Sequence, residues 1–561
     1  MRNFKFLSLL VLAGSMLLLT SCLDLDVENP NAPDATRALG SPDDVEAFVG
    51  SQYQQWWNGT QKNYPGMTLA VMSGHSTASW GNFGMFDLGA VPRQAFINSP
   101  SYADIGMSSV PWSNMYTAIS SVNDVLFALD NGLTFQGDTQ NRAQRMEAFA
   151  RFIQGVSYGV LANHFDRAFL VDETTDLEAV ALGQVELPLS DYQEVLAFAI
   201  AKLDQAIAIA ESSSFTLPEG WVRGNALSSA ELANLARAYK ARYIVSNART
   251  PAERDAINWG EIASLTEQVL NGPNLFNNAD NAFSVQADGD FWWSRPHSLM
   301  QDATWHRAFY PLIGLYDTSG QFETWINLPL NGLDSPRREF ILASADARIN
   351  GVNDSGDFDG TVAGTDFRLG SANNFPEARG LWRRSRHHHF RNREMYDNGF
   401  VGPMQHMRRT EITMYHAEAQ LRQNPGTVPQ IVIDLVNETR VNRGNLPALT
   451  AADGWDYAFN AVRYEWGIET YATHAGLEYY NVRSWGNYKG KDFGAILSGT
   501  PTMFPIPASE LEILEIENYT FGGGGEGSAA RGVIDENGLR VMSAAIQRSN
   551  ERANQLHVTK E

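Results

Sequence analysis

The sequence predicts a mainly α-helical protein made of helix pairs, with one large irregular insertion. Apolar residues recur at helical spacing in long segments before residue 272 and again after residue 409, a pattern typical of amphipathic helices. Between about residues 273 and 409 the sequence is rich in Gly, Asn, Asp and aromatic residues and contains turn signals such as Asn331-Gly332. We therefore expect a helical layer that is interrupted in sequence, with the insertion packed on it.

The helical segments are marked by their start signals and their periodicity. The first is expected to begin after Ser41, because proline and two acidic residues follow it. The segment 228–246 has small and apolar positions that allow a neighbouring helix to pack closely, and it resembles a tetratricopeptide-type helix pair without a strict repeat of about 34 residues. Further helices are expected at 112–130, 141–165, 190–210, 259–271, 410–423, 429–443 and 455–473.

Composition excludes several classes of protein. Cys22 is the only cysteine, so neither an intramolecular disulfide nor a cysteine-based zinc site is expected. The formal net charge of −22 disfavours nucleic acid as a partner. No segment after Cys22 has the ~20 consecutive apolar residues of a transmembrane helix. No linker interrupts residues 41–561, which we expect to form a single domain.

The N-terminus predicts export and lipid anchoring. Arg2 and Lys5 precede an apolar run at 6–19, and Leu19-Thr20-Ser21-Cys22 follows. This arrangement is typical of a signal peptide and resembles the lipobox of bacterial lipoproteins, so residues 1–21 are expected to be removed and Cys22 to be acylated. Residues 22–40 would then be a tether between lipid and fold. The alternative is an ordinary signal peptide with an incidental cysteine.

Several segments, in this order, resemble the SusD/RagB family of outer-membrane nutrient-binding lipoproteins of Bacteroidetes-type bacteria. They are Cys22-Leu23-Asp24-Leu25, Trp112-Ser113-Asn114-Met115-Tyr116, Tyr415-His416-Ala417-Glu418-Ala419 and, most specifically, Phe504-Pro505-Ile506-Pro507-Ala508-Ser509-Glu510. Between the last two, the family's charged "E-G-x-R-x-x-D-x-R-R-W" pattern is replaced by residues 475–485, where several charges are missing. The chain therefore resembles a divergent member, with an additional tail beyond residues 522–525.

The resemblance implies a helical, SusD-like lipoprotein at the outer-membrane surface without catalytic activity. Such a protein captures an oligosaccharide or a peptide, caps a SusC-like TonB-dependent transporter, and delivers the ligand for import. Sugars in such sites are held on aromatic rings with directed hydrogen bonds from polar side chains. The nature of the ligand stays open.

Aromatic and polar residues in loops are the ligand-binding candidates. Trp80 and Asn82, with His75 in the same segment, lie in a Gly/Ser-rich loop, where a tryptophan has no helical core face to join. The insertion, where the family builds its binding face, supplies the other candidates, Trp292, Trp293, Trp305 and Trp325. The alternative for each ring is that it belongs to the core, since large aromatic side chains are mostly buried.

Three other patterns suggest metal binding or catalysis. The basic segment 383–390, with histidines at 387–389, is expected in a solvated loop or on a carboxylate-pairing surface rather than in a metal site, because consecutive side chains diverge. The segment 353–360 is rich in oxygen donors and leaves a structural Ca²⁺ open, although it lacks the EF-hand spacing. Glu465 and Glu469, four residues apart on one helix face, would be the carboxylate pair of an alternative function, a surface glycoside hydrolase.

Overall fold

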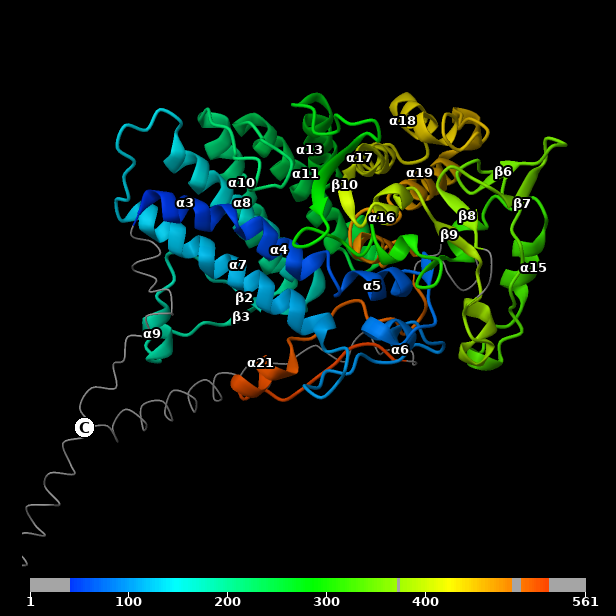
Figure 1. Ribbon diagram of the computed structural model, residues 1–561, viewed down its shortest axis with the longest axis horizontal. Coiled ribbons are helices and arrows are strands. Elements are labelled where there is room, and N and C mark those ends of the chain that lie inside the picture. The colour runs from blue at the N-terminus through cyan, green and yellow to red at the C-terminus, as the bar shows by residue number, and fades with distance from the viewer. Residues whose placement is uncertain (1–40, 371–373, 487–495, 524–561) are drawn as a thin grey trace, which may run out of the picture. The chain divides into compact units, whose positions relative to one another are not determined.

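The computed structural model describes residues 41–370, 374–486 and 496–523 (Figure 1). Helices make up most of the secondary structure, and the strands of this part pair only two at a time. The prediction of a mainly α fold with packed helices and an irregular insertion is confirmed. Within the same ranges, no helix has both the length and the apolar content needed to cross a membrane.

The first helix, α3 (Pro42–Gly50), begins where the sequence predicts. The backbone N–H of Asp44 donates to Ser41 Oγ at 3.2 Å and so satisfies one of the N–H groups that the first turn of a helix leaves unpaired. Residues 1–45 form one unit, of which only 41–45 are described, and the residues from Glu46 onwards form a second compact unit.

The helices before the insertion form a layer of sequential neighbours. They are α4 (Gln52–Thr60), α5 (Gly66–Met72), α6 (Met85–Leu88), α7 (Gly106–Asp130), α8 (Arg142–His164), α9 (Leu177–Ala181), α10 (Tyr192–Ser212), α11 (Ser229–Asn247), α12 (Pro251–Asp255) and α13 (Trp259–Asn271). Helix α8 packs between α7 and α10, and α11 packs on α10 and α13. A short ladder of β2 (Arg167–Phe169) and β3 (Leu189–Asp191) lies between α8 and α10 in sequence.

Two glycines on α8 explain the close approach of its neighbours. A Cβ at Gly155 would lie 2.5 Å from Leu203 Cγ on α10, and one at Gly159 would overlap the Tyr243 ring on α11. Helix α11 begins with the predicted signal: Glu231 N donates to Ser228 Oγ at 3.3 Å, and Ser228 N donates to the Glu231 carboxylate at 2.8 Å. Such a capping box fixes the start of a helix.

The insertion is closed at its base by a two-stranded ladder. Strand β4 (Ala282–Asp288) pairs antiparallel with β10 (Val401–Arg408), so that its two ends lie side by side. Between them lie β5 (Arg307–Ala308), α14 (Tyr310–Ile313), α15 (Gln321–Asn327), β6 (Asn350–Val352), β7 (Phe358–Ala363), β8 (Phe367–Leu369), β9 (His387–His389) and α16 (Arg393–Asp397). In Figure 1, β6 to β9 and α15 gather at the end opposite α8 and α10.

The chain returns to the helical layer after the insertion. The helices here are α17 (Arg409–Gln423), α18 (Gln430–Arg440), α19 (Trp455–Glu469), α20 (Leu477–Val482) and α21 (Ala508–Ile513). Helix α17 packs on α13 and on α18 and α19. One apolar core joins the insertion to α19, because Phe309 and Trp325 share it with Tyr464 and Ile468. The insertion therefore packs on the helical layer, as predicted.

Candidate functional site

A short strand pairing brings two of the predicted tryptophans together. Strand β1 (Ser76–Thr77) pairs antiparallel with β5, with Thr77 opposite Arg307. Because paired antiparallel strands run in opposite directions, the residues after β1 lie beside those before β5. The rings of Trp80 and Trp305 accordingly lie 6.2 Å apart, centroid to centroid, and the Trp80 indole N–H donates to the Thr304 carbonyl.

These two rings belong to a longer row of half-buried aromatic side chains. Phe83 lies 6.3 Å from Trp305, and the Arg295 guanidinium connects Phe83 to Trp293, at 5.7 Å and 4.5 Å from the two ring centroids. We call Trp80, Trp305, Phe83 and Trp293 the aromatic strip. Each of the four rings keeps part of its surface exposed to solvent.

Buried residues hold the strip from beneath and from one end. Trp80, Phe83 and Trp305 pack on a small apolar core made of Met67, Val71, Ala78 and Met85. At the other end, the Trp57 indole N–H donates to the Trp293 carbonyl at 2.8 Å, and Arg295 N donates to the Gln61 carbonyl at 2.9 Å. The last turn of α4 therefore fixes Trp293 and Arg295 beside the loop that follows β1.

Phe83 is held in an unusual backbone conformation. Its φ is 60°, in the left-handed region that bulky residues rarely adopt. Such residues cost about 1–3 kcal/mol and persist where the surroundings hold them. Here the Thr68 hydroxyl donates to the Phe83 carbonyl, and Tyr64 packs edge-on against the ring at 5.4 Å. Strain of this kind concentrates at ligand sites, which favours a functional role for the strip.

Of the other candidates from the sequence, Asn82 lies next to the strip and three are buried away from solvent. Asn82 is exposed and begins the short 3-10 helix η1 (Asn82–Gly84), next to Phe83. His75, Trp292 and Trp325 have 0%, 5% and 2% of their surface exposed. Trp292 stacks on Tyr53 at 6.3 Å, and Trp325 lies in the core of the insertion. These three buried rings offer no face to a ligand, so we leave them out of the candidate site.

Sequence reasoning missed one ring and three cations of the site. Phe83 follows Asn82, and Arg295 lies two residues after Trp293, so both had a signal in their neighbours. Lys62 lies over the Trp293 ring at 4.9 Å and Arg379 over the Trp80 ring at 5.7 Å. Neither lies near a predicted site residue in sequence, so only the tertiary structure identifies them.

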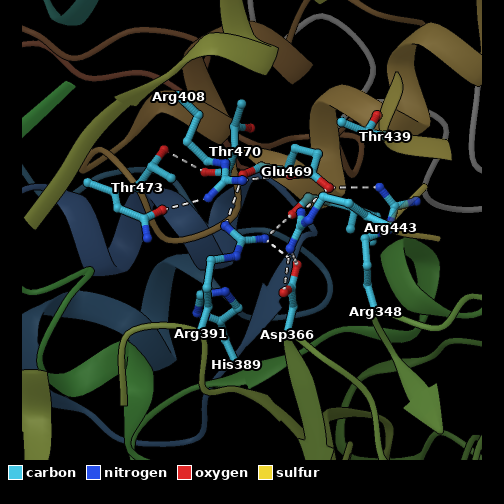
Figure 2. Close-up of polar contacts among 12 residues, drawn as sticks. Arg348, Asp366, His389, Arg391, Arg408, Thr439, Arg443, Glu469, Thr470 and Thr473 are labelled. Carbon is cyan, nitrogen blue, oxygen red and sulfur yellow. Dashed lines mark hydrogen bonds and ion pairs between the residues drawn. The ribbon is translucent and has the colours of Figure 1, made fainter. Parts of the chain in front are cut away.

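The carboxylates of the hydrolase alternative are structural. Glu465 and Glu469 share a face of α19, as predicted, but both are fully buried. Arg348 donates to both, at 2.6 Å and 2.9 Å, and Arg408 donates to Glu469 at 3.1 Å (Figure 2). Arg443 also pairs with Glu469. A glycan has no access to this pair, and the hydrolase alternative loses the residues on which it depends.

The histidine run contradicts its expected solvent exposure. His387, His388 and His389 form β9, pair with β8 and are buried. Burial, with nearby arginines, lowers the pKa of His387 to about 4 and that of His388 to about 3, so both are neutral at pH 7. The prediction of a solvated loop is therefore wrong for the histidines, because they close a ladder inside the insertion. The carboxylate-pairing alternative holds for the preceding arginines, since Arg384 pairs with Glu377 at 2.7 Å and Arg386 with Glu339 at 3.5 Å.

The oxygen-rich segment forms a turn between β6 and β7. Asn353 Oδ1 accepts hydrogen bonds from the backbone N–H groups of Ser355 and Asp357, both at 3.0 Å. In the ranges that the structure describes, no three His, Cys, Asp or Glu side chains are grouped to hold a metal ion. A structural Ca²⁺ in this segment stays a prediction.

An open groove of about 660 Å³ lies elsewhere, between α7 and residues 171–177. Its lining includes the acidic residues Asp124, Asp172, Glu173 and Asp176 as well as apolar residues such as Phe127. Lys202 pairs with Asp172 at 2.9 Å and Arg151 with Glu173 at 2.7 Å. The groove is thus acidic, and two of its charges are already neutralised by the helical layer. The aromatic strip is the better candidate for sugar binding.

Comparison with solved structures identifies the architecture. The surface glycan-binding protein A of Bacteroides uniformis is similar over 84% of this chain and 97% of its own, with a TM-score of 0.53 and 12% identity. The fold is SusD-like. A SusD-like protein of Bacteroides fragilis gives a TM-score of 0.53 at 14% identity, over 85% of this chain and 96% of its own.

A SusD superfamily protein of Parabacteroides distasonis is similar at a TM-score of 0.52 and 16% identity, over 84% of this chain and 97% of its own. No family model and no curated relative matches the sequence. The SusD-like fold that the sequence motifs imply is therefore confirmed.

Proposed function

We propose that this chain is a cell-surface lipoprotein that binds oligosaccharides and delivers them to a SusC-like TonB-dependent transporter of the outer membrane. The observation that supports it best is the aromatic strip, with half-buried rings and polar neighbours on a SusD-like fold. The C–H faces of pyranoses pack on aromatic rings, while nearby polar groups set the orientation.

A glycan is favoured over a peptide as the ligand. One of the similar structures is named as a surface glycan-binding protein, and the exposed groups of the strip are rings and cations rather than an unpaired strand edge that would bind an extended peptide. A peptide ligand remains the second candidate and is an arm of the binding test below.

The anchor and the transporter are further parts of the proposal. The predicted export signal, Cys22 and the tether lie outside the described residues. The test is a pull-down of the intact protein from native membranes in mild detergent, with mass spectrometry of the proteins that copurify. A stoichiometric TonB-dependent barrel is the expected result. Recovery of the protein alone would contradict the transporter part and leave glycan binding to be tested separately.

The ring at the centre of the proposal is Trp80. We expect Trp80→Ala to weaken binding of the best ligand from a glycan and peptide panel about tenfold or more, because a sugar face loses its platform. A tenfold loss corresponds to about 1.4 kcal/mol. The measurement is titration calorimetry on the full chain.

The matched control is Trp455→Ala. Trp455 is also a half-buried tryptophan, but it stacks on Phe459 at 4.9 Å in α19, outside the strip. It should lose stability without losing affinity. Equal affinity of wild type and Trp80→Ala for every ligand bound would remove the strip from the proposed site.

A further inference from the structure

Three cations lie on the rings of the aromatic strip. Lys62 Nζ lies 4.9 Å from the centre of the Trp293 ring, and the Arg295 guanidinium lies 4.5 Å from the same ring. At the far end, the Arg379 guanidinium lies 5.7 Å from the Trp80 ring. Cations at these distances are attracted to the ring faces. Positive charge therefore occurs at both ends of the strip, in a chain whose net charge is −22.

The two arginines are held by neutral groups. Arg379 Nη1 donates to the Ser79 carbonyl at 2.6 Å, and Arg295 Nε donates to Asn63 Oδ1 at 3.0 Å. A guanidinium has five N–H donors, so both retain donors for a ligand. Neither arginine, nor Lys62, forms an ion pair with any carboxylate of the described ranges.

The nearby carboxylates have other partners or stay at longer range. Asp302 accepts from the Tyr396 hydroxyl at 2.8 Å and from Thr304, and Glu377 pairs with Arg384 at 2.7 Å. Asp288 pairs with Arg223 at 3.4 Å. Asp288 and Asp290 act on Lys62 only through longer-range electrostatics. The positive charge of the strip is thus not cancelled locally by ion pairs.

Burial makes the charges of Arg295 and Lys62 costly in the absence of a ligand. It lowers the pKa of Arg295, and it lowers the pKa of Lys62 against the opposing effect of Asp288 and Asp290. A partly desolvated cation gains most from an anion that approaches it.

From this geometry we infer that the ligand of the strip is an acidic oligosaccharide, with uronate carboxylate or sulfate groups bound by Arg295 and Arg379 and sugar rings stacked between them. This inference rests on the proposed function and narrows its ligand class. Guanidinium groups bind carboxylate and sulfate-type oxyanions through paired N–H···O bonds, and the rings of Trp80, Phe83 and Trp305 occupy the space between the two arginines. A neutral glycan would use the rings and leave both cations without an anion.

The test compares acidic and neutral oligosaccharides of equal length. Probes are uronate-containing and sulfated tetrasaccharides and neutral tetrasaccharides, titrated into the full chain at low and at high salt. The variants are Arg295→Gln and Arg379→Gln, each checked by thermal unfolding. The matched control is Arg409→Gln, because Arg409 is equally half-buried but pairs with Glu438 on α18, outside the strip.

We expect at least one acidic probe to bind more tightly than its neutral counterpart, with affinity that falls as salt rises. Each arginine variant should weaken that binding about tenfold to a hundredfold, as expected for the loss of a charged hydrogen bond, while Arg409→Gln should not change it. Neutral probes that bind as well as acidic ones, acidic binding that is insensitive to salt, or unchanged affinity in both arginine variants would each overturn the inference.

The outcomes separate this inference from the proposed function. If neutral glycans bind and Trp80→Ala weakens them while the arginine variants do not, the proposed function stands and the acidic ligand class is wrong. If no acidic and no neutral probe binds, both the proposed oligosaccharide binding and the acidic ligand class are wrong. The salt dependence of the wild-type chain decides the inference even where an arginine variant fails to fold.

Discussion

Glu469 shows how single residues attach the insertion to the helical layer. It lies on α19 and is fully buried, and its carboxylate accepts from Arg348 at 2.9 Å and from Arg408 at 3.1 Å. Arg443 and Arg391 pair in turn with Asp366, at 2.8 Å and 2.6 Å (Figure 2). A buried charge is tolerated only when it is paired and hydrogen-bonded. The network thus requires residues from three separate parts of the chain at once.

We expect Glu469→Gln to lower the free energy of unfolding by about 3–5 kcal/mol, because removing one partner leaves buried arginines uncompensated. Burial acts to raise the pKa of Glu469, but Arg408, Arg443 and Arg348 outweigh it and lower the pKa from 4.5 to about 2. Its contribution is therefore complete above about pH 4.5 and is lost as the pH falls toward 2.

Urea unfolding of wild type and variant between pH 7 and pH 2 measures both effects. The difference in stability between the two proteins should shrink as the pH falls through this window. A loss below about 1 kcal/mol at pH 7, or a difference that does not change with pH, would show that the network contributes little. The scale of about 3–5 kcal/mol refers to removal of one partner from a buried ion pair.

At the residue scale, the sequence predicts which residues share a helix face, but it does not predict their burial or their ion-pair partners. The shared helix face of Glu465 and Glu469 follows from their spacing, but their arginine partner at 348 lies more than a hundred residues away. The same limit applies to the histidines at 387–389, whose burial depends on pairing with β8. Local patterns do not contain these long-range partners.

At the element scale, several helices are predicted closely, although α7 begins at Gly106, six residues before the expected start at 112. The expected segment 259–271 matches α13, and 410–423 differs from α17 by one residue at its start. Side-chain caps and amphipathic spacing are local properties, so the sequence determines them directly. The strands of the insertion are not predicted, because β4 and β10 pair across more than a hundred residues.

The packing of these helices depends on Gly159 of α8. We expect Gly159→Ala to destabilise the protein by about 1–3 kcal/mol, because a Cβ there would overlap the Tyr243 ring and force α8 and α11 apart. This expected net loss already includes the gain of about 1 kcal/mol that alanine brings to a helix interior. Thermal and urea unfolding provide the measurement.

Gly260→Ala is the matched control, since it lies in α13 and its added Cβ would meet nothing closer than 3.4 Å. It should be neutral or slightly stabilising. If both variants were equally stable, the close approach of α8 and α11 would not depend on the glycine.

At the scale of the whole molecule, the candidate site is assembled from distant segments. Lys62 follows α4, Trp80 and Phe83 follow β1, Trp293 and Trp305 lie in the first part of the insertion, and Arg379 lies further within it. The sequence suggested three of the four rings from their loop context. It did not suggest the cations, because the pairing of β1 with β5 and the contact of Arg379 with Ser79 are tertiary. The same tertiary contacts bring cationic side chains together at the strip, in a protein whose net charge is negative.

The location of the molecule depends, in our proposal, on one atom outside the described residues, the Cys22 sulfur. We expect Cys22→Ser to abolish labelling with radioactive palmitate, because serine has no thiol for the acyl chain. Without acyl chains the protein should be released from the outer-membrane fraction, because these chains supply its membrane affinity. Fractionation and labelling of whole cells measure both. Cys22 is the only cysteine, so the substitution removes no disulfide from the fold. The released protein should therefore keep its melting temperature and its affinity for the ligand.

Retention in the membrane fraction with full labelling would contradict acylation at Cys22. Retention without labelling would instead show that the bound transporter suffices to hold the protein at the membrane.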